Sequence, residues 1–287
     1  MRELRQQLTN ALMAVLTVAA LIAAGINFQQ QAKFRLPVDG ATWVDQGGRP
    51  VAVHVDPGSP AANAGIHEGD VLRSMAGVRV NSTQQATQIL ASLGPWRKAD
   101  YRILHGGVEV PAVVVIGEAP RPASLYYQYA VGVIYLAIGL YVYVRRRGAP
   151  RALHFFLLCL LSFILSTFHY TGKLNNFDKI IYLGNVVAGF LVPALFLHFA
   201  CSYPEQQAWI RRKGAAFLVY IPGLALLSAH LAFNFGWLRA ATPLVEVLWL
   251  LDRVWLGYLC VFYLAGAGVF HVQRARATDA IVRSQLT

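Results

Sequence analysis

The sequence predicts an α-helical integral membrane bundle of about six spans with one inserted α+β domain. Three observations lead to this fold class. The mean hydropathy of +0.45 and the 56% share of hydrophobic residues exceed what an ordinary soluble domain carries. Several apolar runs reach the length that crosses a bilayer. Between the first two runs the chain changes to short β-like stretches separated by glycine and proline turns, which indicates a folded insert.

Six apolar runs are long enough to span a hydrocarbon core of about 30 Å at about 1.5 Å per residue. They are Ala11–Phe28, Tyr126–Val144, Ala152–Thr171, Ile180–Cys201, Ala215–Phe233 and Val254–Val272. The first run follows Arg2 and Arg5, so it fits either a membrane anchor or a cleaved signal peptide, and the insert is exported in both cases. The predicted organisation is a first transmembrane helix or signal anchor over 1–30, the insert over 34–119, a five-span region over 124–273, and a cytoplasmic tail or the start of a linker helix over 274–287.

The first half of the insert has local signals for each element. Val51–Val55 has the composition of a strand and runs into a proline–glycine turn. Pro60 suits the first turn of a short helix, because the N–H that it lacks has no partner there. Gly65 can end that helix in the left-handed conformation. Gly69-Asp70 is turn chemistry before the next extended run.

The second half of the insert continues the α+β pattern. Ser82 and Gln85 form an S-x-x-Q capping box that opens a helix over Thr83–Leu93. Two β-like runs then flank the turn His105-Gly106-Gly107 and predict a closing hairpin between Tyr101 and Ile116.

The order PGSPA-x-x-AGI-x-x-GD over Pro57–Asp70 resembles the PDZ domains of the bacterial HtrA type. The resemblance implies that the insert binds extended peptides. Gly40, Ala41, Thr42 and Trp43 stand where PDZ domains carry a G-Φ-G-Φ loop whose backbone N–H groups capture a terminal carboxylate. The groove residues that the resemblance implies are Gly40, Ala41, Thr42, Trp43, Val44, Asp45, Thr83, Thr87 and Leu90.

The loop departs from the family pattern at its second glycine, which is Thr42 here. A β-branched residue tolerates positive φ poorly, so we expect weak capture of a free carboxylate. Pairing of an extended peptide with the edge at Trp43–Asp45 is less affected by this change. The alternative is that the domain serves only as a spacer.

The formal net charge of +11 encodes orientation rather than nucleic-acid binding. The basic clusters lie in alternate connections between the runs, whereas the charges of the insert are nearly balanced. Under the positive-inside rule both termini are cytoplasmic and the insert lies outside the membrane. No nucleic-acid partner is expected, because no aromatic-rich basic face accompanies the charge. The clusters are Arg2 and Arg5; Arg145, Arg146, Arg147 and Arg151; Arg211, Arg212 and Lys213; Arg274, Arg276 and Arg283.

Motifs for catalysis are missing from the sequence. It has no H-E-x-x-H, no G-x-S-x-G and no G-x-x-x-x-G-K-[ST], so we predict no enzyme, no catalytic residue, no metal site and no cofactor. Cys159, Cys201 and Cys260 lie in or at the end of apolar runs and form no C-x-x-C motif. Gly132 and Gly139, with Ala137, allow close approach of a neighbouring helix.

Five histidines lie in or near the apolar runs, and two interpretations of them stay open. Their places near the ends of the runs favour an interfacial or structural role. A ligand or proton-relay role is the alternative, because ionisable residues within a membrane are often functional. The five are His154, His169, His198, His230 and His271.

The segment Leu195–Glu205, LFLHFACSYPE, resembles the "LHF…(F/Y)PE" segment of multi-span bacterial sensor proteins. In that group a first helix, an exported PDZ domain and further spans precede a histidine kinase or a SpoIIE-type phosphatase. The resemblance implies a multi-pass protein of the bacterial inner membrane, with its PDZ domain periplasmic or extracellular. No such output domain is present up to Thr287, so a cytoplasmic kinase or phosphatase would act as a separate effector or follow in a longer parent protein.

The function predicted from these observations is signal sensing. The PDZ domain would bind a peptide or protein segment, and the helices would pass the signal to a cytoplasmic output domain or partner; a homodimer is possible. One alternative is a non-signalling membrane scaffold that recruits envelope proteins through the PDZ groove. A further alternative makes the helical bundle a binding site for a small molecule.

Overall fold

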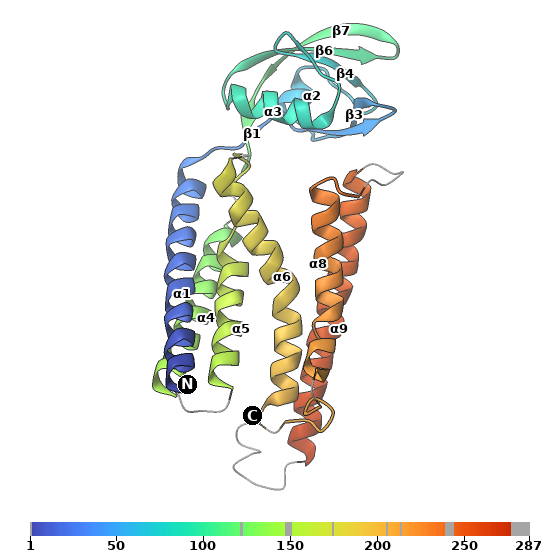
Figure 1. Cartoon of the computed structure of the whole chain (residues 1–287). Coiled ribbons are helices and arrows are strands. Elements are labelled where there is room, and N and C mark those ends of the chain that lie inside the picture. The colour runs from blue at the N-terminus through green and yellow to red at the C-terminus, as the bar shows by residue number, and fades with distance from the viewer. Residues whose placement is uncertain are drawn as a thin grey trace. The chain divides into compact units, whose positions relative to one another are not determined.

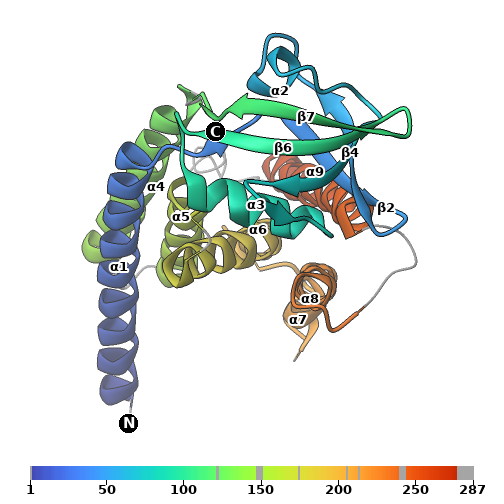
Figure 2. The same ribbon diagram turned by 90° about the horizontal axis from the view of Figure 1, so that it is seen from above.

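A computed structural model describes residues 2–120, 123–146, 151–173, 175–204, 206–212, 214–238 and 244–276. The chain divides into two compact units. The helical unit comprises Met1–Phe28, Ala123–Tyr170 and Lys179–Thr287, and the globular unit comprises Gln29–Pro122 and Thr171–Asp178. Figures 1 and 2 show the elements of both. Helix α9 includes residues 274–276 of the predicted tail, and residues 277–287 lie outside the described residues. The predicted basic residues Arg147, Lys213 and Arg283, and Glu205 of the LFLHFACSYPE segment, also lie outside them.

The globular unit contains an antiparallel sheet with the strand order β2-β3-β4-β6-β7, and β5 pairs with β4. A separate two-stranded pair joins β1 to β8. The strands are β1 Pro37–Val38, β2 Ala41–Gln46, β3 Arg49–Val55, β4 Val71–Met75, β5 Val78–Arg79, β6 Lys98–His105, β7 Val108–Val115 and β8 Gly117–Glu118. The closing hairpin predicted around Gly106 is β6–β7, in which His105 pairs with Val108.

Two helices of the globular unit, α2 (Pro60–Asn63) and α3 (Thr83–Leu93), begin at the residues that the sequence predicts for them. Ser59 caps α2 by accepting a hydrogen bond from the Ala62 N–H. Ser82 caps α3 in the same way through the Gln85 N–H, and the Gln85 side chain accepts from the Asn81 N–H. The local capping chemistry thus fixes where each helix starts.

The core of the globular unit lies between the sheet and these helices. Its largest fully buried side chains include Tyr101, Ile66, Leu72, Met75 and Ile103. Leu72 and Met75 come from β4, and Tyr101 and Ile103 come from β6, the two strands at the centre of the sheet. This core anchors two aspartates that matter below. Asp70 directly precedes β4, and Asp39 accepts a hydrogen bond from the hydroxyl of Tyr101 on β6.

The connection from Thr171 to Asp178 also belongs to the globular unit, although it follows the α5 helix. Asp178 is fully buried and accepts hydrogen bonds from the Thr171 N–H, the Thr171 hydroxyl and the Gly172 N–H, at 2.7–2.9 Å. A Cβ at Gly172 would lie 2.5 Å from Leu36 Cδ1, and the Lys173 ammonium lies 5.1 Å from the centroid of the Phe34 ring. The sequence did not indicate that this connection packs on the insert.

Four helices of the helical unit are long and apolar enough to cross a membrane, so the prediction of six spans is not confirmed. These four are Gln6–Lys33 of α1 (Arg2–Lys33), α4 (Ser124–Arg145), α6 (Asn176–Ser202) and Glu246–Arg276 of α9 (Leu244–Arg276). Two shorter apolar helices are α5 (Ala152–Thr167) and α8 (Ile221–Asn234). At about 1.5 Å per residue the shorter two reach about 21–24 Å, less than a hydrocarbon core of about 30 Å.

The two shorter helices are shorter than the predicted runs for identifiable reasons. The predicted run Ala152–Thr171 leaves the helix after Thr167, where the Asn185 side chain donates to the carbonyls of Leu165 and Phe168. The predicted run Ala215–Phe233 is divided into α7 (Ala215–Leu218) and α8, because Pro222 favours the first turn of a new helix.

Helices α4 and α5 approach closely at the glycines of α4, as the sequence predicts. A Cβ at Gly132 would lie 2.7 Å from Thr167 Cγ2, and one at Gly139 would lie 2.5 Å from Cys159 Cβ. Ala137, in contrast, is exposed, so it takes no part in this contact. The side-by-side course of α4 and α5 is visible in Figure 1.

Most of the predicted intramembrane histidines make polar contacts inside the helical unit. His230 lies 2.7 Å from the Tyr182 hydroxyl and His198 lies 2.9 Å from the Tyr220 hydroxyl. The rings of His154 and His198 have centroids 4.4 Å apart. The backbone of His169 exchanges two hydrogen bonds with the buried side chain of Asn27, whereas His271 is exposed. These contacts favour the structural interpretation of His169, His198 and His230, whereas the buried Nε2 of His154 has no hydrogen-bond partner among the described residues.

Candidate functional site

The predicted groove residues fall on two elements of the globular unit, β2 with the loop before it and α3. Strand β2 lies at one end of the sheet, and β3 is its only strand partner among the described residues. Its other edge is therefore available for pairing with an extended peptide. A register shift between Thr42 and Trp43 marks an irregularity in its pairing with β3.

The loop before β2 is held by the buried carboxylate of Asp39. Asp39 Oδ1 accepts a hydrogen bond from the Ala41 N–H at 3.1 Å, and Oδ2 accepts from Trp43 Nε1 at 3.0 Å and from the Tyr101 hydroxyl at 3.1 Å. Burial, followed by the charge of Asp39, raises the pKa of Tyr101 well above its ordinary value of 10.0. One of the loop N–H groups that would bind a peptide carboxylate is thus already bonded to a carboxylate of this chain.

Gly40 is the loop position where the backbone requires glycine. It has a φ of +82°, and a Cβ there would lie 2.2 Å from Ser59 Cβ. Thr42, which stands at the second glycine of the family pattern, lies in the extended strand β2 and does not take positive φ. Trp43 and Val44 are buried, while Thr42 and Asp45 are exposed.

Helix α3 is joined to β2 through one carboxylate. Asp45 Oδ1 accepts from the Thr83 N–H at 2.7 Å and from the Thr83 hydroxyl at 2.8 Å. Thr87 is exposed and its hydroxyl donates to the Thr83 carbonyl, whereas Leu90 is half-buried and packs against the core. The structure thus brings Asp45 and Thr83 together, and it places Thr87 and Leu90 on the following turns of α3.

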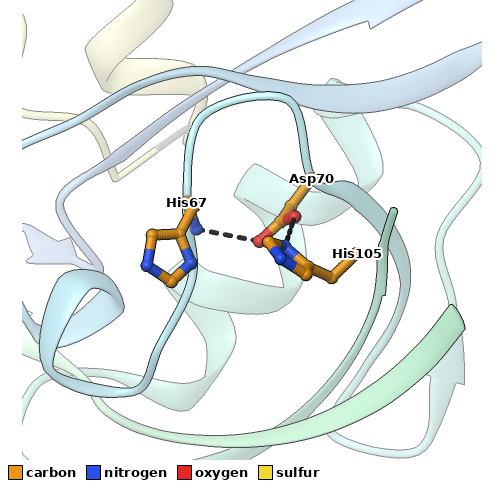
Figure 3. A group of neighbouring side chains, drawn as sticks. All are labelled: His67, Asp70 and His105. Atoms are coloured by element: carbon orange, nitrogen blue, oxygen red, sulfur yellow. Dashed lines mark hydrogen bonds and ion pairs between the residues drawn. The ribbon is translucent and has the colours of Figure 1, made fainter. Parts of the chain in front are cut away.

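A second cluster in the globular unit was missed by the sequence analysis. His67 follows α2, Asp70 precedes β4, and His105 ends β6, and their potential ligand atoms lie within 4.8 Å of one another (Figure 3). The H-x-x-D spacing of His67 and Asp70 was visible in the sequence. The approach of His105 was not, because it depends on the register of β4 and β6, which pairs Val71 with Leu104.

Comparison with known proteins identifies the domain. Residues 51–95 match the family model of the PDZ domain. The matched residues run from β3 through α3, so this part of the globular unit is a PDZ domain. A comparison of the whole chain with curated proteins finds no match.

Solved structures similar to this chain include proteins of the HtrA type. One is the HtrA-type protease AlgW with a decapeptide, at 20% identity over 31% of each chain, with a TM-score of 0.29. Another is the serine endoprotease from Yersinia pestis, at 20% identity over 36% of each chain, with a TM-score of 0.30. A third is the HtrA3 PDZ domain bound to a phage-derived ligand, at 13% identity over 29% of this chain and 86% of that one, with a TM-score of 0.26. The chain spans about a third of the length of the two proteases.

Proposed function

We propose that the PDZ domain binds an extended peptide between β2 and α3. The peptide would pair as a strand with the free edge of β2 and contact α3 on its opposite side. The observation that carries this proposal is the place of β2 at the end of the sheet, with α3 joined to it through Asp45 and Thr83. Main-chain hydrogen bonds to β2 would supply affinity, and side chains at Thr87 and Leu90 would set the preference. HtrA-type structures that contain peptides support the proposal by analogy.

The preferred ligand in this proposal is a segment whose recognition does not depend on a free C-terminal carboxylate. The Ala41 N–H is bonded to Asp39, and the Asp39 carboxylate stands beside the loop that captures the ligand carboxylate in the family pattern. A second carboxylate would meet this charge with one N–H fewer to stabilise it. Hydrophobic residues of the peptide, rather than its end group, would then provide the affinity.

The membrane context extends the proposal to signal sensing. The chain would be a multi-pass protein of a bacterial inner membrane with both termini cytoplasmic and the PDZ domain outside. Ligand binding would shift the helices and so act on a cytoplasmic kinase or phosphatase. The sequence pattern of the basic residues supports this topology. The second candidate is a scaffold that recruits envelope proteins without signalling, and no catalysis by this chain is part of either candidate.

Peptide titration of the purified full chain in detergent micelles tests the first part of the proposal. A library of extended peptides with hydrophobic ends is expected to contain binders of about micromolar affinity or weaker, which is typical of transient recognition. Thr87→Asp places a charge against the bound strand and should weaken binding at least about 10-fold. Gln88→Asp adds the same charge at an exposed position about 100° further around α3 and serves as the control. No binder in the library, or equal loss in both variants, would contradict the proposal.

Two further experiments separate sensor from scaffold and test the topology. Reporter fusions that are active only outside the membrane should work at Ser92 and fail at Gly148. Peptide binding should change the chemical accessibility of cysteines introduced at Gln273 and Arg276 at the end of α9 if the protein is a sensor. If the accessibility of these cysteines does not change with saturating peptide, the sensor function is contradicted and the scaffold function is the better candidate.

A further inference from the structure

A cluster on the surface of the globular unit has the composition of a transition-metal site. It consists of His67, Asp70 and His105, whose potential ligand atoms all lie within 4.8 Å of one another. The three side chains come from the α2–β4 loop, the start of β4 and the end of β6, so the sheet brings together residues far apart in the sequence (Figure 3). None of them belongs to the predicted groove set.

The carboxylate at the centre of the cluster is fixed before any ion arrives. Asp70 is 2% exposed, and its Oδ2 accepts a hydrogen bond from the His67 N–H at 2.8 Å. Its Oδ1 lies 2.6 Å from His105 Nδ1. The carboxylate is therefore oriented by the backbone of one histidine and points at the ring of the other, as the two dashed lines in Figure 3 show.

The two imidazoles are exposed, so the site could close by rotation of their side chains. Their ring centroids lie 5.4 Å apart. Nitrogen and oxygen ligands bind Zn²⁺ at about 2.0–2.2 Å in tetrahedral geometry, which places neighbouring ligand atoms about 3.3–3.5 Å apart. Separations of up to 4.8 Å must shorten by at most about 1.5 Å, whereas the 2.6 Å contact between Asp70 Oδ1 and His105 Nδ1 must lengthen by about 0.7–0.9 Å. The side chain of His105 is 56% exposed, so it is free to make this adjustment.

The donor set decides which ion would bind. Two imidazole nitrogens and one carboxylate oxygen suit Zn²⁺, Co²⁺, Ni²⁺ and Cu²⁺, whereas Mg²⁺ and Ca²⁺ require mostly oxygen ligands. We propose that His67, Asp70 and His105 bind one Zn²⁺-class ion, with a water molecule in the fourth position. On binding, the contact between Asp70 Oδ1 and His105 Nδ1 is replaced by metal ligation, and each neutral imidazole binds through one nitrogen and keeps its proton on the other.

The bound ion would join two segments that are separate in the sheet. His67 lies in the loop after α2, and His105 begins the turn that connects β6 to β7. An ion that binds only the folded arrangement stabilises it in proportion to its concentration above the dissociation constant. Metal binding would therefore couple the availability of Zn²⁺ to the stability of the PDZ domain.

Titration of the full chain in detergent micelles with Zn²⁺ and Co²⁺, after removal of any affinity tag, tests the proposal. We expect an ion-dependent rise in the unfolding temperature and a visible Co²⁺ absorption band, neither of which Mg²⁺ reproduces. His67→Asn and His105→Asn should each weaken Zn²⁺ binding at least about 10-fold, because even the loss of a group that only orients a metal ligand costs about 10–100-fold in affinity. His54→Asn is the matched control, because His54 is an exposed histidine of the same domain that pairs with Glu68 instead.

The outcomes separate a metal site from an ordinary ion pair. Loss of binding in both cluster variants with retention in the His54 variant supports the site. Binding that persists in both cluster variants would place the ion elsewhere in the chain, and no binding in the unmodified chain would leave His105 and Asp70 as an ion pair; either result overturns the proposal.

Discussion

Two of the regions of the globular unit that contain a buried aspartate differ in what surrounds the carboxylate. In the connection Thr171–Asp178, the carboxylate of Asp178 is fully buried and accepts from two backbone N–H groups and one hydroxyl. At the start of β4, the carboxylate of Asp70 is 2% exposed and accepts from one backbone N–H and contacts an exposed imidazole. The two burials are nearly equal, so burial alone does not distinguish a structural carboxylate from a binding site. The identity and exposure of the partner groups do.

Asp39 is a third example, and it resembles Asp178 more than Asp70. All three of its partners are fixed donors: the Ala41 N–H, the Trp43 indole and the Tyr101 hydroxyl. None of these partners can bind a metal ion as a neutral imidazole can. The carboxylate of Asp39 therefore shapes the loop before β2, and Asp70 alone of the three has a partner that can exchange a hydrogen bond for ligation.

The largest expected effect on stability follows from removing the carboxylate of Asp178, all of whose partners are hydrogen-bond donors of the same connection. Asp178→Ala leaves two buried N–H groups and one hydroxyl without their acceptor, which should destabilise the globular unit by about 3–5 kcal/mol. Asp70→Ala removes one such backbone bond and should cost about 1–3 kcal/mol. Thermal unfolding of the two variants of the full chain measures the difference. A larger loss for Asp70→Ala would break the distinction drawn between the two regions.

Gly40→Ala should have the next largest effect, because it disturbs the loop that Asp39 holds. The new Cβ would meet Ser59 at 2.2 Å in a backbone of positive φ, and we expect a destabilisation of about 2–3 kcal/mol. Gly58→Ala is the control: its φ is also positive, at +72°, but a Cβ there meets nothing within 4 Å. Equal unfolding temperatures for the two variants would show that the contact with Ser59 yields at little cost.

The burial of Tyr101, together with its contact to Asp39, predicts an alkaline loss of stability. The pKa of Tyr101 is raised in the folded state, so the contribution is fully present below about pH 10 and falls as the pH rises from there toward the folded-state pKa. One such group contributes a slope of about 1.4 kcal/mol per pH unit. Unfolding temperatures measured between pH 9 and pH 11 should fall less steeply for Tyr101→Phe than for the unmodified chain. Tyr127→Phe, at a largely exposed position, should leave the slope unchanged.

The smallest effect is expected for the end group of the bound peptide. Because the Ala41 N–H is already bonded to Asp39, a peptide with an amidated C-terminus should bind within about 2-fold of the free acid, a difference of at most about 0.4 kcal/mol. Competition between the two forms of one peptide on the full chain measures the ratio. A preference for the free acid of 10-fold or more would show that the loop captures carboxylates despite Asp39 and Thr42.

The parts of the fold that the sequence predicts well are those with local causes. The helix Thr83–Leu93 has the predicted bounds because Ser82 and Gln85 cap its start and Gly94, at φ +77°, ends it. The predicted number of six spanning helices is not confirmed, because hydropathy sums composition and takes no account of tertiary contacts that shorten a helix. One such contact is the hydrogen bonding of Asn185 near the end of α5.

The candidate sites likewise contain some features with local sequence signals and others that depend on contacts between distant residues. The loop at Gly40 and the helix at Thr83 follow from a motif, whereas the hydrogen bond from Ala41 to Asp39 required coordinates. The cluster at Asp70 depends on strand register, and the packing of Gly172 against Leu36 joins residues separated by four helices and a sheet. Contacts of this range leave no periodic signal in a single sequence.

The packing of Thr171–Asp178 on the insert makes the PDZ-containing unit a discontinuous domain. The chain passes between the two units at Phe28, at Ala123, at Tyr170 and again at Lys179, rather than only at the two ends of the insert. A fragment cut at residues 34 and 119 would lose the buried Asp178 and the covering of Leu36 and Phe34. The excised domain should therefore unfold at a lower temperature than the same domain in the full chain. A fragment that retains Thr171–Asp178 through a short artificial linker should recover the difference.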